Sequence, residues 1–322
     1  MFMNNLLTNR KRLFIFVKYN CSMLSTMEKS SMIQKVKSCI PPLDGNSHKG
    51  QSGRIGIIGG SLEYTGAPYF AGISALKVGA DLVHIFCASS AATVIKSYSP
   101  ELIVHPLLDH PNAVNDISPW LDRLHAIVIG PGLGRDNKTL EVVSELIKTI
   151  NTKNIPLVID ADGLFLITQN LDLIRNFKSS VILTPNKIEF ERLCEKVNGY
   201  SELNKLGENI VVFKKGQTDE IFCASNIAQW KSNEGGSGRR CGGQGDILSG
   251  SIATFLHWMI SNGDKLNMSP ADKCMTSSIS CYAASILVRK CNEKAFSIYG
   301  RSMVAGDMIG FIHEAFQELY GE

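Results

Sequence analysis

Short apolar runs alternate along the chain with longer stretches in which apolar residues recur every three or four positions. The runs are typical of buried strands and occur at residues 54–58, 81–87, 102–105, 126–129, 157–160, 181–183 and 210–213, with a hairpin partner at 220–224. The periodic stretches predict helices at residues 69–78, 137–150, from about 164, 187–195, 245–260, 271–289 and 302–319. This alternation predicts an α/β fold with a mostly parallel sheet covered by helices on both faces. We expect a single domain because the chain has no internal repeat and no low-complexity linker.

Residues 235–250 form a glycine-rich segment that leads directly into one of these helices. Glycine occupies positions 235, 236, 238, 242 and 243. Such a segment lets backbone N–H groups turn toward one point, and the first N–H groups of a helix have no partner within the helix. The positive end of the helix dipole lies behind them. The sequence therefore predicts an anion site, with Arg239 and Arg240 beside it.

Asp246 lies where that anion would bind. A carboxylate repels a phosphate, but it can accept the proton of a hydroxyl group during phosphoryl transfer. This favours a catalytic loop. The alternative is a flexible surface loop in which Asp246 caps the helix.

Polar residues follow other predicted strands, at the edge where open α/β sheets bind ligands. Asp160 and Asp162 can hold a hydrated Mg²⁺ or a ribose, and the alternative is an Asp cap for the next helix; the two interpretations are compatible. The remaining polar residues at this edge are Ser61, Tyr64, Thr65, Asn186, Glu189, Lys215, Thr218 and Asp219. For Ser61, Tyr64 and Thr65 a simple polar turn is the alternative to a ligand site.

Two nucleotide-binding motifs are excluded. Residues 132–139 nearly match a P-loop, but Asn137 stands where the second glycine is required, so we reject a P-loop NTPase. The glycines there still allow a ligand to approach closely. No Gly-x-Gly-x-x-Gly opens a helix after the first strand, which disfavours a Rossmann oxidoreductase.

Composition narrows the class of protein. The 322 residues are 44% hydrophobic and 20% charged, enough for one large core or two ordinary ones. The net charge of +3 arises in residues 1–40, which carry seven Lys/Arg and one acid; the remainder holds 26 basic and 29 acidic residues, so it has no nucleic-acid signature. Nine scattered Cys without a Cys-x-x-Cys pair, and seven dispersed His, predict neither a disulfide frame nor a zinc site.

Residues 1–43 are expected to form a leader that is largely disordered, ahead of a folded domain at 44–322. The leader has no acid before Glu28, and its apolar run at residues 13–17 is too short for a membrane span. This composition is typical of a mitochondrial presequence. Translation from Met23 or Met27 would instead give a cytosolic form, so the expected location is mitochondrial, cytoplasmic or both.

Seven motifs, in order, carry a family resemblance. They are HKGQSGRIGIIGGS, YTGAPYFAGISALKVGADLVHIFC, GPGLGRD, DADGL, LTPNKIEF, KKGQTDEI and RRCGGQGDILSG. Over residues 44–320 the chain resembles the ATP-dependent NAD(P)H-hydrate dehydratases, which have a ribokinase-like fold within the carbohydrate kinase superfamily. The RRCGGQGD form is closer to the ATP-using eukaryotic branch than to bacterial relatives that use ADP.

The resemblance implies a repair reaction. ATP phosphorylates the 6-hydroxyl of the S-form of hydrated NADH or NADPH, and phosphate then leaves to restore the dihydronicotinamide ring. Asp246 would be the base, and the amides of Gly243 and Gly245 would stabilise the transferred phosphate. Mg²⁺ would bridge the phosphates of ATP, although the sequence singles out no protein ligand for it.

The remaining site residues are also implied by the resemblance. The hydrated dinucleotide would contact Asp246 together with Gly134, Asn186, Lys187, Ile188, Glu189, Phe190, Glu191 and Arg192. ATP would contact Lys215, Gly216, Gln217, Thr218, Asp219, Gly236, Ser237, Gly238, Arg239, Arg240, Cys241, Gly242, Gly243, Gln244 and Gly245. The expected partners are these small molecules, with no nucleic acid and no membrane. The sequence leaves a homo-oligomer open.

Two other functions compete with this one. A small-molecule kinase of the same fold would use the same base and amides to phosphorylate a vitamin alcohol and release a stable ester. A non-catalytic nucleotide-binding regulator would keep the nucleotide site, but it would be free to lose the Asp246 carboxylate.

Overall fold

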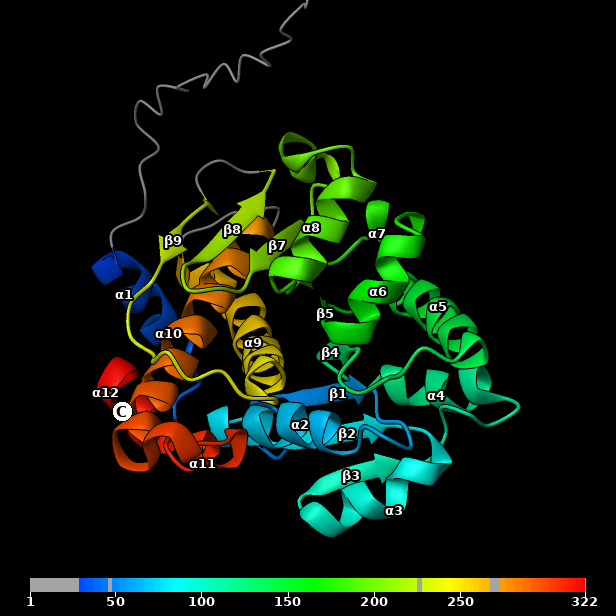
Figure 1. The fold of residues 1–322 in the computed structure, drawn as a ribbon, viewed down its shortest axis with the longest axis horizontal. Helices are drawn as coiled ribbons and strands as arrows, with labels where there is room; N and C mark the ends of the chain where they lie inside the picture. Colours follow the sequence, from blue (N-terminus) through cyan, green and yellow to red (C-terminus); the bar gives the residue numbers. More distant parts are fainter. Residues whose placement is uncertain (1–28, 46–47, 225–227, 267–272, 322) are drawn as a thin grey trace, which may run out of the picture.

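A computed structural model describes residues 29–45, 48–224, 228–266 and 273–321 of the chain (Figure 1). Within these residues the strands form one sheet in the order β3-β2-β1-β4-β5-β6-β7-β8-β9. The strands are β1 (Arg54–Ile58), β2 (Leu82–Phe86), β3 (Leu102–His105), β4 (Ala126–Ile129), β5 (Leu157–Ile159), β6 (Val181–Leu183), β7 (Ile210–Lys214), β8 (Asp219–Cys223) and β9 (Lys231–Ser232). Neighbours from β3 to β7 pair in parallel, whereas β7–β8 and β8–β9 pair antiparallel.

The strand order reverses at β1. The chain adds β2 and β3 on one side of β1 and then returns to place β4 on its other side, with Ile55 beside both Val83 and Ala126. Loops that follow β1 and β4 therefore leave the sheet in opposite directions. Such a switch point opens a crevice at the carboxyl edge of a parallel sheet.

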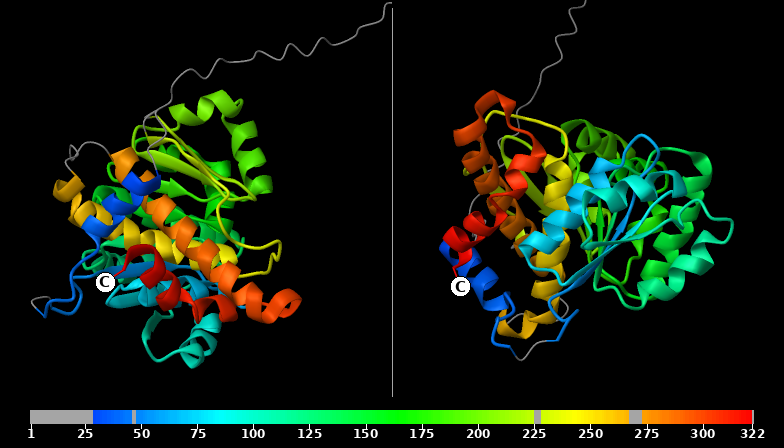
Figure 2. Two further views of the ribbon diagram at one scale, coloured as in Figure 1. Left: turned by 90° about the vertical axis from the view of Figure 1, so that its left-hand side faces the viewer. Right: turned by 90° about the horizontal axis from the view of Figure 1, so that it is seen from below.

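Helices cover both faces of the sheet (Figure 2). A hydrophobic core lies on each face. Successive strand residues point to opposite faces, so Val128 belongs to one core while Ile127 and Ile129 belong to the other. The first core contains residues from α1 (Lys29–Cys39), α2 (Gly66–Val78), α3 (Ser89–Tyr98), α9 (Gln244–Ser261), α10 (Lys273–Tyr299), α11 (Ala305–Ile309) and α12 (Ile312–Tyr320). The second contains residues from α4 (Ala113–Leu121), α5 (Asn137–Thr152), α6 (Ala161–Gln169), α7 (Asp172–Arg175) and α8 (Lys187–Lys196).

The parallel sheet, its terminal hairpin and the glycine-initiated helix are confirmed, but the helical layer differs from the prediction. The helix predicted at residues 302–319 is two short helices, α11 and α12, because the N–H of Phe311 bonds to the carbonyl of Met308, which tightens the turn after Gly310. The helix predicted to end at Arg289 continues to Tyr299, and its first two predicted positions, 271 and 272, lie outside the described residues. Sequence reasoning missed α1, α3, α4 and α7.

Helix α1 lies inside the segment expected to be a leader. Met32, Val36 and Cys39 are buried in the first core, and the side-chain amide of Asn262 donates to the carbonyl of Cys39 at 3.1 Å. Residues 29–39 therefore belong to the folded domain, contrary to the expectation for 1–43. The basic segment and the alternative starts at Met23 and Met27 lie outside the described residues. Among the residues that are described, no helix is long and apolar enough to cross a membrane.

We predict that Val36→Ala lowers the free energy of unfolding by about 2 kcal/mol, because it removes methyl groups from a fully buried position. Denaturant unfolding of the full chain measures this. Lys37→Ala, at an exposed position of the same helix, is the matched control. Equal stability of the two variants would show that α1 is not part of the core.

Candidate active site

The first turn of α9 presents a set of unpaired backbone N–H groups, here called the amide ring and formed by Gly243, Gln244 and Gly245. No residue in the described ranges accepts a hydrogen bond from these groups. Gly243 precedes the helix with φ of 92°, and a Cβ there would lie 2.6 Å from the Cβ of Ala305 and 2.9 Å from the ring of Phe70. Only glycine fits this conformation and this space. These N–H groups are therefore available to an anion, and the anion site itself stays a prediction.

The glycine-rich loop that leads to α9 is tied to the helices around it. The N–H of Ser237 donates to the side chain of Asn292 at 2.6 Å, and Nε of Arg239 donates to the carbonyl of Met303 at 3.2 Å. Gln244 donates back to the carbonyl of Arg239 at 3.2 Å. The loop is thus anchored on both sides, unlike the flexible surface loop considered as an alternative. Arg239 uses its guanidinium on backbone carbonyls.

A cavity of about 470 Å³ lies beside the amide ring. Eleven predicted site residues line it: Asn186, Lys215, Gly216, Asp219, Gly236, Arg240, Cys241, Gly242, Gly243, Gln244 and Gly245. The structure does not bring Gln217, Thr218, Ser237, Gly238 or Arg239 into its lining. The wall that sequence reasoning missed comes from α9, α10 and α11 and consists of Leu248, Val288, Arg289, Asn292 and Met308.

Arg289 joins the two loops that form most of the cavity. Its Nε donates to Asp219 Oδ2 at 2.8 Å, and its terminal nitrogens donate to the carbonyls of Gly216 at 2.9 Å and Gly235 at 3.4 Å. Ser285 also donates to Asp219 Oδ2 at 2.7 Å, and the N–H of Gly216 donates to Asp219 Oδ1 at 2.9 Å. Both carboxylate oxygens of Asp219 are therefore occupied within the protein, so this side chain holds the loop in place.

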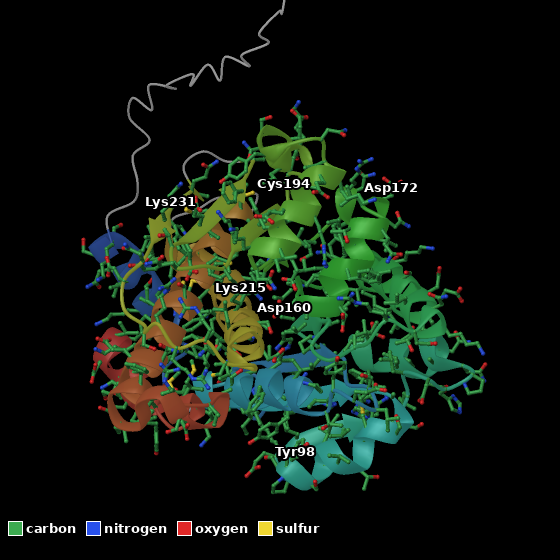
Figure 3. The ribbon with its side chains drawn as sticks, in the orientation of Figure 1. Tyr98, Asp160, Asp172, Cys194, Lys215 and Lys231 are labelled. Atoms are coloured by element: carbon green, nitrogen blue, oxygen red, sulfur yellow. The ribbon has the colours of Figure 1, made fainter. Side chains whose placement is uncertain are left out.

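Asp246 lies in the first turn of α9, near two oppositely charged side chains that Figure 3 shows next to each other, Asp160 and Lys215. Burial raises the pKa of the Asp246 carboxyl, and the Asp160 carboxylate raises it further against the opposing effect of Lys215, to about 8. A carboxyl with this pKa is a suitable proton acceptor near neutral pH. Asp246 follows the amide ring directly in the sequence, and its role as a catalytic base stays a prediction.

Asp160 has two partners of its own. Its side chain accepts from the N–H of Ala161 at 2.9 Å, so it caps α6, and it pairs with Nζ of Lys215 at 2.6 Å. Asp162, the second carboxylate of this motif, binds the N–H of Gly134 at 3.0 Å and pairs with Arg135 at 2.9 Å. Among the described residues, no three His, Cys, Asp or Glu side chains are placed to hold a metal ion.

The predicted dinucleotide residues occupy different environments. Asn186 and Glu189 form a capping box at the start of α8, in which each side chain accepts from the other residue's N–H. The side chain of Phe190 is only 5% exposed and packs against Tyr200 and Phe222, so it faces the second core and not the cavity. Asn186 is exposed and lines the cavity. The side chains that are exposed but lie outside the lining are Lys187, Ile188, Glu191 and Arg192.

Gly134 lies at the switch point between β1 and β4. It has φ of 77°, and a Cβ there would lie 3.4 Å from Oγ of Ser61. The loops after β1 and β4 meet backbone to backbone, since a Cβ on Gly59 would lie 2.1 Å from the carbonyl oxygen of Pro131. Gly134 and Ser61 therefore share one rigid corner of the carboxyl edge.

The sequence that forms this site matches a known family. The family model described as NAD(P)H-hydrate dehydratase matches residues 55–311. The chain belongs to the NAD(P)H-hydrate dehydratase family.

Relatives named ATP-dependent (S)-NAD(P)H-hydrate dehydratase support this membership. The protein from Aedes aegypti is 53% identical over 294 residues, covering 91% of this chain and 86% of its own length. The human protein is 45% identical over 307 residues, covering 92% of this chain and 86% of its own length. Among solved structures, an ADP/ATP-dependent NAD(P)H-hydrate dehydratase from Bacillus subtilis, co-crystallised with ATP/Mg²⁺, aligns with a TM-score of 0.64 at 20% identity, covering 89% of this chain and 97% of that one. That likeness confirms the ribokinase-like fold.

We predict that Arg289→Lys weakens ATP binding about tenfold or more, because the single ammonium of lysine cannot replace the bonds of Arg289 to the 216–219 loop and to Gly235. Calorimetric titration of ATP measures the dissociation constant. Lys290→Ala, which removes the neighbouring cation of α10, is the control. If the Arg289→Lys variant bound ATP as tightly as the wild type, Arg289 would not be needed to hold the two loops for ATP binding.

The raised pKa of Asp246 predicts a pH-dependent stability of the ligand-free protein. Its pKa is about 8 in the folded state against 3.8 in the unfolded state, so the folded protein holds the proton more tightly. The resulting stabilisation is fully present below about pH 4 and is lost as the pH rises through about 8. Asp246→Asn has no such loss and should exceed the wild type at pH 8.5 by on the order of 1 kcal/mol. Thermal unfolding at pH 5 and pH 8.5 tests this, and a parallel pH response of the two proteins would contradict it.

Proposed function

We propose that this enzyme uses ATP to dehydrate the S-form of hydrated NADH or NADPH back to the intact dihydronicotinamide nucleotide. The observation that carries the proposal is the unpaired amide ring, which lines a cavity of about 470 Å³ and is followed in the next position by the Asp246 carboxyl, whose pKa is raised by burial. A base and an anion site next to each other are what phosphorylation of an alcohol requires. Relatives at 53% and 45% identity are named for this activity.

The two substrates would approach the amide ring from different sides. ATP would occupy the cavity between the 215–219 loop and the glycine-rich loop, where Lys215 and Arg240 supply positive charge. The hydrated nicotinamide would lie on the side of Gly134, Asn186 and Asp246. These assignments follow the family resemblance, and the side chain of Phe190 is excluded from ligand contact by its burial.

The reaction then proceeds in two stages. Asp246 accepts the proton of the ring hydroxyl, whose oxygen bonds to the γ-phosphorus as ADP leaves. The amide ring stabilises the charge on the transferred group, and loss of one such donor typically costs about 3 kcal/mol. The lone pair of the ring nitrogen next breaks the carbon–oxygen bond and releases phosphate, and loss of a proton from the neighbouring ring carbon restores the double bond. The products are ADP, phosphate and the dinucleotide, so the overall reaction is that of a carbon–oxygen lyase.

Mg²⁺ is part of the proposal as a partner of the nucleotide. The residues that the structure describes offer no metal cluster, and Asp160 already binds Lys215 and the N–H of Ala161. We therefore propose that the ion arrives with ATP, held by phosphate oxygens and water. When bound, it would offset negative charge on the phosphates.

Incubation of the purified chain with acid-hydrated NADH, ATP and Mg²⁺ should release ADP and phosphate in equal amounts and restore the near-ultraviolet absorbance of dihydronicotinamide. Asp246→Asn should lower this turnover about a hundredfold or more, because it removes the positioned base. ATP binding to the variant should remain near that of the wild type.

Omission of ATP and replacement of ATP by ADP are the controls for the phosphoryl donor, and hydrated NADPH tests the second dinucleotide. A phosphate ester that persists, without recovery of absorbance, would establish the kinase alternative. ATP binding without any turnover would establish the regulator.

A further inference from the structure

Asp160 and Lys215 form a charged pair that joins two separate loops at the carboxyl edge. Asp160 follows β5, and Lys215 follows β7, two strands further along the sheet. Nζ of Lys215 lies 2.6 Å from Oδ1 of Asp160, and their side chains are only 18% and 3% exposed. Removing both charges from water is costly, so a buried pair is weak evidence of a purely stabilising role.

The backbone around Asp160 is held in an unusual conformation. Ala161 has φ of 46°, which is rare for a residue with a Cβ. A Cβ on Gly130 would lie 1.8 Å from the carbonyl oxygen of Asp160, so the neighbouring loop fixes that carbonyl by direct backbone contact. Strained backbone that the surroundings maintain is concentrated at functional sites. The backbone that carries the Asp160 carboxylate is therefore fixed in place, and the cost is conformational strain at Ala161.

The pair lies against the start of α9. Nζ of Lys215 is 3.2 Å, and Oδ2 of Asp160 3.7 Å, from the point that a Cβ on Gly245 would occupy. The N–H of Lys215 donates to the carbonyl of Pro185 at 2.9 Å, which anchors the loop that carries the ammonium. The ammonium is thus held beside the amide ring and lines the cavity proposed for ATP.

The charges near this ammonium come from three elements. Burial lowers the pKa of Lys215, but the carboxylates of Asp160 after β5, Glu189 on α8 and Asp246 on α9 outweigh that effect and raise it. Lys215 is therefore a permanent cation. The charged groups that act on Asp246 itself are Asp160 and Lys215, in opposite directions.

We propose that Asp160 is a positioning residue of the reaction: it holds the Lys215 ammonium beside the amide ring, where that ammonium contacts the transferred phosphoryl group. This inference rests on the proposed function. A purely structural role would not affect the titration of Asp246. A positioning role predicts that removal of either charge of the pair shifts that titration, although neither side chain is hydrogen-bonded to Asp246.

The test compares Asp160→Asn, Lys215→Met and the double variant with the wild type. Asn keeps the acceptor for the N–H of Ala161, and each single variant should lower kcat about ten- to a hundredfold. Loss of the Asp160 charge should move the acid limb of the kcat/KM profile to lower pH, whereas loss of the Lys215 charge should move it to higher pH. The double variant should return the limb toward the wild-type position without recovery of kcat.

Asp172→Asn is the matched control, because it makes the same chemical change at a side chain that is 79% exposed on α7. The carboxyl of Asp246 is also titrated by carbon-13 NMR in the ligand-free proteins, with Asp246→Asn giving its assignment. This titration does not need turnover, so it tests the pair even in an enzyme without dehydratase activity. Failure of the wild type to dehydrate hydrated NADH would reject the proposed function but not the effect of the pair on Asp246. The inference would be overturned if the acid limb of the kcat/KM profile and the titration of Asp246 were the same in all variants as in the wild type, with only the thermal stability lowered.

Discussion

The site depends on how closely helix α9 approaches helix α2. A Cβ on Gly250 would lie 1.9 Å from the carbonyl oxygen of Ala71, so the two helices touch backbone to backbone. Thr254 reinforces the contact by donating to the carbonyl of Ala75 at 3.2 Å. This approach brings Gly243 between Phe70 of α2 and Ala305 of α11. A larger residue at position 250 would push α9 outward and move the amide ring with it.

That rigid placement explains why a poorly solvated carboxyl is tolerated at Asp246. Burial and the Asp160 carboxylate both disfavour its ionised form. The packing of α9 on α2 fixes the helix independently of this side chain. The free-energy cost of ionising Asp246 is therefore offset by contacts elsewhere on the helix. The same carboxyl in a loosely packed turn would rotate into solvent and lose its elevated pKa. The folded protein therefore tolerates an unfavourable ionisation at one residue, which is common at functional sites.

The sequence predicted the strands and the amide ring because both depend on local patterns. A run such as residues 126–129 has few conformations available once it is buried on both faces, and glycine at 243 reflects one backbone requirement. The far wall of the cavity has no such local signal. Arg289 and Asn292 lie in a helix that is buried nearly all round, so no periodic stripe shows which face meets the glycine-rich loop.

Other misses have the same cause. The side chain of Phe190 could face either Tyr200 or the cavity, and the motif that contains it does not specify which. Helix α1 carries basic and polar residues between its three buried positions, and the same composition favours a leader. In both cases the deciding contact is made with a residue distant in sequence. The charge of Arg289 gives no signal either, because α10 also carries Lys273, Lys290 and Lys294.

The two antiparallel strands at the end of the sheet have a consequence for catalysis. Strand β8 runs back from the carboxyl edge, and β9, antiparallel to β8, returns to it, so β9 points the same way as β7. The glycine-rich loop after β9 therefore starts at the edge where Lys215 follows β7 and Asp160 follows β5 (Figure 1). Without β9, the glycine-rich loop would start at the opposite edge of the sheet. Helix α9 would then begin far from the strand ends that carry Asp160 and Lys215. Strand β9 has only two residues, yet it determines that the amide ring and the switch-point crevice share one edge of the sheet.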